Sequence, residues 1–280
     1  MLEAVLFSVM LVVLAVGAYS DIRTREVPDW LNFAGIVAGI GIRALWGVAG
    51  NGWAELGYGL LGFIVFFGLA TIMYYSGQWG GGDSKLLMAV GTLLGFGFSL
   101  KSPSLAFVLW ALLAGAAYGV VWSIALAVKN WNSFAKSYGV LSRSVKWAHF
   151  PVLAVLALGV AFAIATNDEL LRVLMLVVSL VVPLLFYVGL MVKAVENCCM
   201  YKFLPVGKLT EGDWIAKVVK VKGSYVCGPK DLGITKEKIE QLKRLRVKEV
   251  LVKEGIPFVP SLLVAFVLFL VFGSPLAWFF

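Results

Sequence analysis

Long apolar runs separated by short polar breaks constrain the fold of this chain more than any other feature. A helix needs about 20 apolar residues to cross the hydrocarbon core of a bilayer. Hydrophobic residues make up 61% of the 280 residues, which is more than a soluble domain can bury. We therefore predict an all-α polytopic membrane protein with about eight transmembrane helices. The predicted spans are 2–19, 30–48, 54–76, 85–100, 104–128, 150–166, 170–192 and 258–273.

Two points about these spans stay open in the sequence. The sixth and seventh are joined only by Thr166-Asn167-Asp168-Glu169, and the count drops to six if that hairpin does not cross. The N-terminus lacks the basic region of a signal peptide and its apolar run is long, so we expect a retained first helix.

Lysine and arginine in short loops predict the orientation, because cytoplasmic loops carry an excess of both. The basic loops fall on one side if the N-terminus faces outward, which places Asp21 and Asp83 at the cytoplasmic face of the plasma membrane. Lys101 is the one exception on the opposite side. The residues used are Arg23, Arg25, Lys85, Lys129, Lys136, Arg143 and Lys146.

Residues 193–257 form the only sizeable polar segment, with 14 Lys and Arg against 8 Asp and Glu. We predict a small basic α+β cytoplasmic domain here. Its elements are strands over 214–221, 225–227 and 247–253, a turn at 228–231, and a helix over 236–246 capped by Thr235. It either contacts anionic lipid headgroups or helps to hold substrate.

The predicted domains are 1–128 (catalytic core), 129–192 (basic loop and hairpin), 193–257 (small basic domain) and 258–280 (last span).

Several classes of ligand are excluded or disfavoured. The net charge of +8 fits membrane topology, and no aromatic-interleaved basic patch suggests nucleic acid. The cysteines Cys198, Cys199 and Cys227 form no CxxC pair, and the single His149 is far from them, so we expect no metal and no cofactor. Gly57 to Gly62 matches GxGxxG inside a span, without a preceding strand, so we do not expect dinucleotide binding there, and we interpret the GxxxG pairs as helix packing. Those pairs are Gly35/Gly39, Gly91/Gly95 and Gly115/Gly119.

Two aspartates at the ends of spans are the candidate catalytic residues. Asp21 follows the first span and Asp83 precedes the fourth, on the same predicted face, and the connections between these spans are short. Two carboxylates that converge share a proton, so that one activates water while the other protonates a carbonyl. This is the chemistry of aspartic peptide hydrolysis, which needs no metal.

Other interpretations of the same residues stay open. Asp21 can pair with Arg23 or Arg25, and Asp83 can cap a helix. A transporter or channel can use both aspartates as an ion relay, although that predicts carboxylates near the bilayer midplane. A scaffold that gathers filament subunits without cutting them is a third possibility. The glycines Gly80, Gly81 and Gly82 favour the peptidase, because they permit unusual backbone angles and the close approach of an extended peptide.

Two segments resemble one family. "GGGD", residues 80–83, fits the GxGD motif of membrane aspartyl proteases, and "DIRTREVPDWLN" and "GGGDSKLL" resemble the two aspartate segments of type IV prepilin peptidases and archaeal preflagellin peptidases. "EGDWIAKVVKV" and "GIPFVPSLL" resemble the polar domain and last span of the preflagellin subgroup. The resemblance implies that Asp21 and Asp83 are the catalytic pair of a membrane aspartic endopeptidase. It would remove short N-terminal leaders from preflagellin (archaellin) or prepilin-like precursors on the cytoplasmic side.

The departures from the family are informative. Bifunctional bacterial members carry a CxxC loop, which is missing here, so methyltransferase activity is not expected. The presenilin and signal-peptide-peptidase branch has a late PAL tripeptide, and this chain has only Ser274-Pro275-Leu276-Ala277.

Further residues near the aspartates complete the predicted site. Gly80, Gly81, Gly82 and Lys85 would form the active-site loop that gives access to substrate, and Arg23, Glu26 and Asp29 are candidate substrate contacts. Helix dipoles, with Lys85 beside Asp83, predict that Asp83 is the initial base and Asp21 the initial acid.

Overall fold

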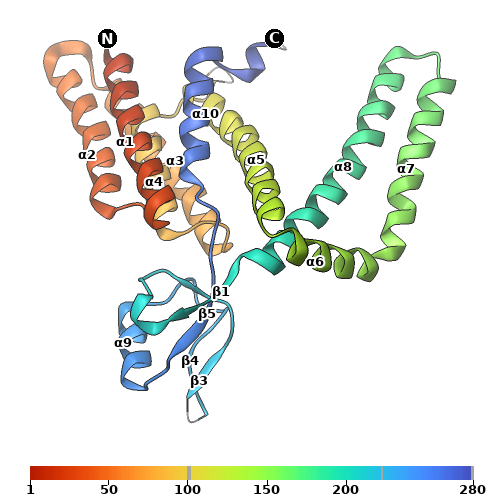
Figure 1. Ribbon diagram of the computed structural model, residues 1–280. Helices are drawn as coiled ribbons and strands as arrows, with labels where there is room; N and C mark the ends of the chain where they lie inside the picture. The colour runs from red at the N-terminus through yellow and green to blue at the C-terminus, as the bar shows by residue number, and fades with distance from the viewer. Residues whose placement is uncertain (100–101, 222, 279–280) are drawn as a thin grey trace. The chain divides into compact units, whose positions relative to one another are not determined.

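The structure is a computed structural model that describes residues 1–99, 102–221 and 223–278 (Figure 1). Lys101, the exception to the predicted charge pattern, lies outside these residues. The chain forms two compact units. The first comprises Met1–Gly119, Leu204–Val250 and Gly255–Phe280, and the second comprises Val120–Phe203 and Leu251–Glu254.

Each of the eight predicted spans coincides with a helix over most of its length, although the fourth ends at Leu94, and six of the described helices are long and apolar enough to cross a membrane. Two shorter helices, α4 (Gly81–Leu94) and α10 (Val259–Phe272), have 14 residues each. The predicted polytopic membrane fold is confirmed. The six long helices are α1 (Leu2–Thr24), α2 (Asp29–Trp46, extended by the π-helical turn η1, Gly47–Asn51), α3 (Ala54–Tyr75), α5 (Pro103–Lys129), α7 (Lys146–Ala165) and α8 (Glu169–Cys199).

In the first unit α4 is surrounded by α1, α2 and α3, and nine of its 14 residues are buried. Glycines make this close packing possible. A Cβ atom added at Gly35 of α2 would lie 2.9 Å from the Ala89 Cβ of α4, and one at Gly39 would lie 2.6 Å from the Thr92 Oγ1. On the other side Gly91 of α4 packs against Phe66 of α3. The GxxxG pairs therefore pack helices as predicted, except that the second glycine of the last pair, residue 119, faces open space.

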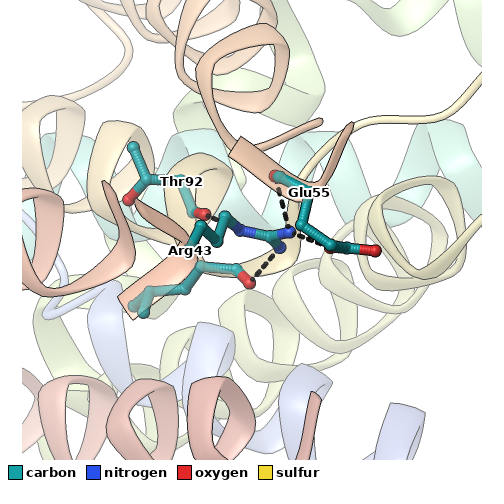
Figure 2. Close-up of polar contacts among 4 residues, drawn as sticks. Arg43, Glu55 and Thr92 are labelled. Carbon is teal, nitrogen blue, oxygen red and sulfur yellow. Dashed lines mark hydrogen bonds and ion pairs between the residues drawn. The ribbon is translucent and has the colours of Figure 1, made fainter. Parts of the chain in front are cut away.

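A buried arginine fixes the end of α4 that is far from Asp83 (Figure 2). Arg43 of α2 is 3% exposed. Its guanidinium donates to the Thr92 carbonyl at 3.1 Å, to the Leu93 carbonyl at 3.0 Å and to the Glu55 carboxylate of α3 at 2.7 Å. The last carbonyls of a helix have no partner within the helix, so this one side chain satisfies two of them and also joins α2, α3 and α4.

The second unit contains the hairpin of α7 and α8 and a helix that the sequence did not predict, α6 (Trp131–Ser144). The turn between α7 and α8 is closed as expected, because Asp168 caps α8 by accepting the Leu171 N–H at 3.0 Å. Gly159 allows the two helices to approach closely, since its added Cβ would lie 2.6 Å from the Ser179 Cβ. Figure 1 shows α6 running crosswise to α7 and α8.

The predicted α+β domain is present, with two small sheets of order β1-β5-β2 and β3-β4. The strand expected over 214–221 is split into β2 and β3, and β1 was not predicted. Thr235 caps α9 as expected, accepting the Lys238 N–H at 3.4 Å. The elements are β1 (Tyr201–Pro205), η2 (Val206–Lys208), β2 (Trp214–Ile215), β3 (Val219–Val221), β4 (Ser224–Cys227), α9 (Lys236–Arg244) and β5 (Glu249–Lys253), and a last turn η3 (Pro275–Trp278) follows α10.

Candidate active site

Asp21 lies in the last turn of α1, where the chain leaves the helix. Arg25 ends α1 in the left-handed conformation, with φ of 60°, and its N–H donates to the Asp21 carbonyl at 2.9 Å. Pro28 is the residue immediately before α2, and its fixed φ suits that position. The Asp21 side chain is only 5% exposed, so the sequence places a carboxylate inside the protein at this end of α1.

The partner of Asp21 comes from the other end of the chain. Its Oδ2 accepts the backbone N–H of Val259, the first residue of α10, at 2.9 Å. The first N–H groups of a helix have no partner within it, and they favour a negative charge. This contact was missed by sequence reasoning, because a backbone donor at residue 259 leaves no mark on the residues around the aspartate.

Asp83 lies in the first turn of α4, outside the six candidate spans, and the Gly80 N–H donates to its carboxylate. The pKa of Asp83 is raised to about 7. The main cause is burial, which removes the carboxyl from water, and the second is the negative charge of Asp21. Two carboxylates that interact in this way favour a state with one shared proton.

Packing one turn away from each aspartate places both at the same end of the helix bundle. A Cβ atom added at Gly17, one turn before Asp21, would lie 3.5 Å from a methyl group of Leu86 and 3.4 Å from one of Val259. Leu86 is one turn after Asp83 on α4. The ends of α1, α4 and α10 therefore meet, and they bring the two predicted catalytic residues together.

The three glycines before Asp83 do not all act as expected. None of them has a positive φ, so the predicted need for unusual backbone angles is wrong. The left-handed glycine of this loop is Gly77, with φ of 68°. Gly82 is required for close approach, since its added Cβ would lie 3.2 Å from the backbone of Val27, whereas Gly80 and Gly81 have ordinary clearance.

Lys85 and Asp29 pair with each other. The Lys85 Nζ lies 2.7 Å and 2.8 Å from the two Asp29 carboxylate oxygens, which joins the first turns of α4 and α2. Arg23 is exposed and stacks over the Tyr19 ring at 5.2 Å. Glu26 is exposed, and its carboxylate makes no ion pair with a described residue. Of the candidate substrate contacts, Asp29 is therefore engaged and Glu26 is available.

Asn32 is a second residue that sequence reasoning did not single out. It is fully buried on α2, and its Nδ2 donates to the Gly82 carbonyl at 3.2 Å, next to Asp83. The Oδ1 of Asn32 and the Oγ of Ser84 are buried without a partner among the described residues. An amide inside an apolar helix was the available signal, because a buried amide normally satisfies its polar groups.

The C-terminal part of the chain also contacts the glycine loop. Trp79 packs on Phe258, with ring centroids 4.9 Å apart, just before α10 begins. The Trp214 ring of β2 lies 3.6 Å from the position of a Cβ atom at Gly77. Arg25 donates to the Gly255 carbonyl at 3.1 Å. Segments from both ends of the chain thus form the surroundings of the two aspartates.

Comparison with known proteins agrees with this arrangement. A protein-family model described as the type IV leader peptidase family matches residues 8–120, which include both aspartates and the glycine loop. No curated protein and no solved structure gives a match to the chain. The match confirms the resemblance seen in the two aspartate segments. Residues 8–120 of this multi-pass membrane protein are thus similar to the type IV leader peptidase family.

Proposed function

We propose that the protein is an aspartic endopeptidase that removes short N-terminal leaders from preflagellin (archaellin) or prepilin-like precursors at the cytoplasmic face of the plasma membrane. The observation that carries this proposal is the meeting of Asp21 and Asp83 at one end of the helix bundle, with the charge of Asp21 acting on Asp83. The family match supports a leader peptidase, and leader peptidases of this family act on prepilin-like substrates.

We further propose that Asp21 is the initial base and Asp83 the initial acid. Burial and the charge of Asp21 raise the pKa of Asp83 to about 7, so Asp83 is the carboxyl that we expect to hold the shared proton, and the Val259 N–H supports the charge that remains on Asp21. This reverses the assignment drawn from helix dipoles alone. The reversal has a physical cause: the end of α1 disfavours a negative charge on Asp21, but the start of α10 opposes that effect.

The reaction then follows from these two protonation states. Asp21 takes a proton from a water molecule, whose oxygen attacks the carbonyl carbon of the scissile peptide bond. Asp83 donates its proton to the carbonyl oxygen, which gives a neutral tetrahedral intermediate. Asp21 then gives the proton it took to the leaving nitrogen, the C–N bond breaks, and Asp83 recovers its proton from the intermediate as the new carboxyl group forms.

The substrate reaches this pair from the side of the glycine loop. Gly81 is exposed and Gly80 has room around it, so an extended leader can lie close to the Asp83 backbone. The Glu26 carboxylate, which forms no ion pair with a described residue, is the candidate contact for a basic residue in the leader. If that is so, Glu26→Lys slows cleavage of a leader with a basic residue near the cut and favours one with an acidic residue there; equal rates for both leaders would remove the assignment.

A cleavage assay with purified protein tests the function. A preflagellin-like precursor is incubated with the wild type, Asp21→Asn or Asp83→Asn, and the products are identified by mass. Asparagine can still accept the Val259 N–H, so Asp21→Asn removes the charge and retains the contact with α10. We expect one cut at the leader junction by the wild type and none by either variant. A wild type that binds the precursor without cutting it would support a scaffold instead.

A further inference from the structure

The helix α6 is held at the membrane surface by its neighbours in the chain. Single residues, Asn130 and Val145, separate it from α5 and α7, and both of these are candidate spans. Its 14 residues extend about 21 Å, which is too short to cross the bilayer. The helix must therefore lie where the two spans leave the hydrocarbon, and its crosswise course relative to α7 fits this position (Figure 1).

The faces of α6 are chemically distinct. One side carries large apolar residues at helical spacing: Trp131, Phe134, Tyr138 and Leu141. The ring centroids of Trp131 and Phe134 are 5.8 Å apart, and those of Phe134 and Tyr138 are 5.7 Å apart. No residue of α6 is buried, and Trp131 is 61% exposed. Ser137 of α6 donates from its Oγ to the Ala194 carbonyl of α8 at 3.0 Å. Phe134, Tyr138 and Leu141 are half-buried on the side that faces α8, whereas Trp131 at the start of the helix stays exposed.

The opposite face and both ends of α6 are positively charged. Lys136 and Arg143 lie two turns apart on the polar face, and Lys129 and Lys146 flank the helix. The sequence has no acidic residue between Asp83 and Asp168. None of the four cations forms an ion pair with a described residue; Lys146 lies over the ring of Trp147, which is 80% exposed. The local excess of charge needs anions from outside the described chain.

We propose that α6 is an in-plane helix that binds anionic phospholipid headgroups. The exposed Trp131 enters the interfacial layer, where such rings are favoured, and Lys136 and Arg143 hold the headgroup phosphates. Basic side chains near a membrane surface attract anionic lipids, so phosphatidylglycerol collects beside this helix in preference to phosphatidylcholine.

Quenching by brominated lipid tests this site. The full chain is reconstituted in bilayers of phosphatidylglycerol and phosphatidylcholine at equal mole fractions, with bromine on one lipid or the other. The fluorescence of Trp131 and Trp147 is obtained as the difference between the wild type and Trp131→Phe/Trp147→Phe. We expect stronger quenching by brominated phosphatidylglycerol. Lys136→Gln/Arg143→Gln should reduce that preference by roughly fivefold for each cation removed.

A matched control separates a local site from net charge. Lys220→Gln/Lys230→Gln removes two exposed cations of the small domain and should leave the preference unchanged. If the first charge variant fails to fold, Lys129→Gln/Lys146→Gln replaces it. Equal quenching by both lipids in the wild type would overturn the proposal. A preference for phosphatidylglycerol that survives Lys136→Gln/Arg143→Gln, or the variant that replaces it, would overturn it as well. Absence of quenching by either lipid would mean that protein covers α6, and would overturn it too.

Discussion

At the scale of single residues, the two aspartates differ in what surrounds them. Both are withdrawn from water, but Asp21 accepts a backbone N–H from the start of α10, whereas Asp83 accepts one from the glycine loop and its pKa is raised further by the charge of Asp21. Two groups of the same type can therefore take opposite roles, as a base and as an acid, because their environments separate their affinities for protons.

This difference predicts the pH dependence of cleavage. Asp83 must carry a proton to act as the acid, and its pKa is about 7. Its protonated fraction falls as the pH rises through that value, so kcat/KM should fall about tenfold per pH unit on the alkaline side. The measurement is kcat/KM for a precursor from mildly acidic to alkaline pH, with folding checked at each pH. A rate that rises through neutral pH would mean that Asp83 works in its ionised form.

At the scale of elements, the last helix belongs to the site although it follows the family-matched region. Residues 8–120 match the family, but the donor to Asp21 is Val259. The chain runs from β5 into α10 (Figure 1), so the small domain is connected directly to the residue that holds the aspartate. This link connects the C-terminal part of the protein to the proposed catalytic residue Asp21.

Replacing Val259 tests that role. Val259→Pro removes the N–H at the first position of α10 and disfavours the αR conformation of Phe258 before it, whereas Val259→Ala keeps the N–H. A hydrogen bond to a charged group contributes about 1.5–3 kcal/mol, so the proline variant should lose roughly 10- to 100-fold in kcat/KM. Its acid limb should also move to higher pH, because Asp21 then binds a proton more readily.

The alanine variant is the control, since both substitutions reduce the volume of a fully buried side chain. Melting temperatures of the two variants show whether loss of packing explains a change in rate. If proline and alanine slow cleavage equally, the Val259 N–H has no special part in the reaction.

At the scale of the whole molecule, Arg43 and the glycines hold α4 in place between its neighbours. Arg43→Met should lower the free energy of unfolding by about 3 kcal/mol, because two carbonyls of α4 and the Glu55 carboxylate lose their buried partner. Arg143→Met, at an exposed arginine of α6, should change it by less than about 0.5 kcal/mol. Denaturation in mixed micelles measures both. Equal effects would show that the Arg43 cluster does not stabilise the bundle.

Much of this architecture could be predicted because its signals are local. Apolar length predicted all eight helices, and small residues predicted their packing. The features that the sequence did not predict are contacts between distant parts of the chain and a helix of mixed polar and apolar composition. The contacts of Arg43 and Asp21 are with backbone atoms of other helices, which no side chain in the sequence reveals. The α6 segment carries serines, glycine and charges in place of a continuous apolar run, so its sequence predicts a loop although its aromatic residues recur at helical spacing.

The central claim is that Asp21 and Asp83 act as one catalytic unit, and a double-mutant comparison tests it most directly. Single-turnover cleavage rates are measured for the wild type, Asp21→Asn, Asp83→Asn and the double variant. Groups that act as a unit lose their function together, so the account predicts the same residual rate in all three variants. A single variant that keeps a substantial rate, with a further multiplicative loss in the double variant, would contradict it.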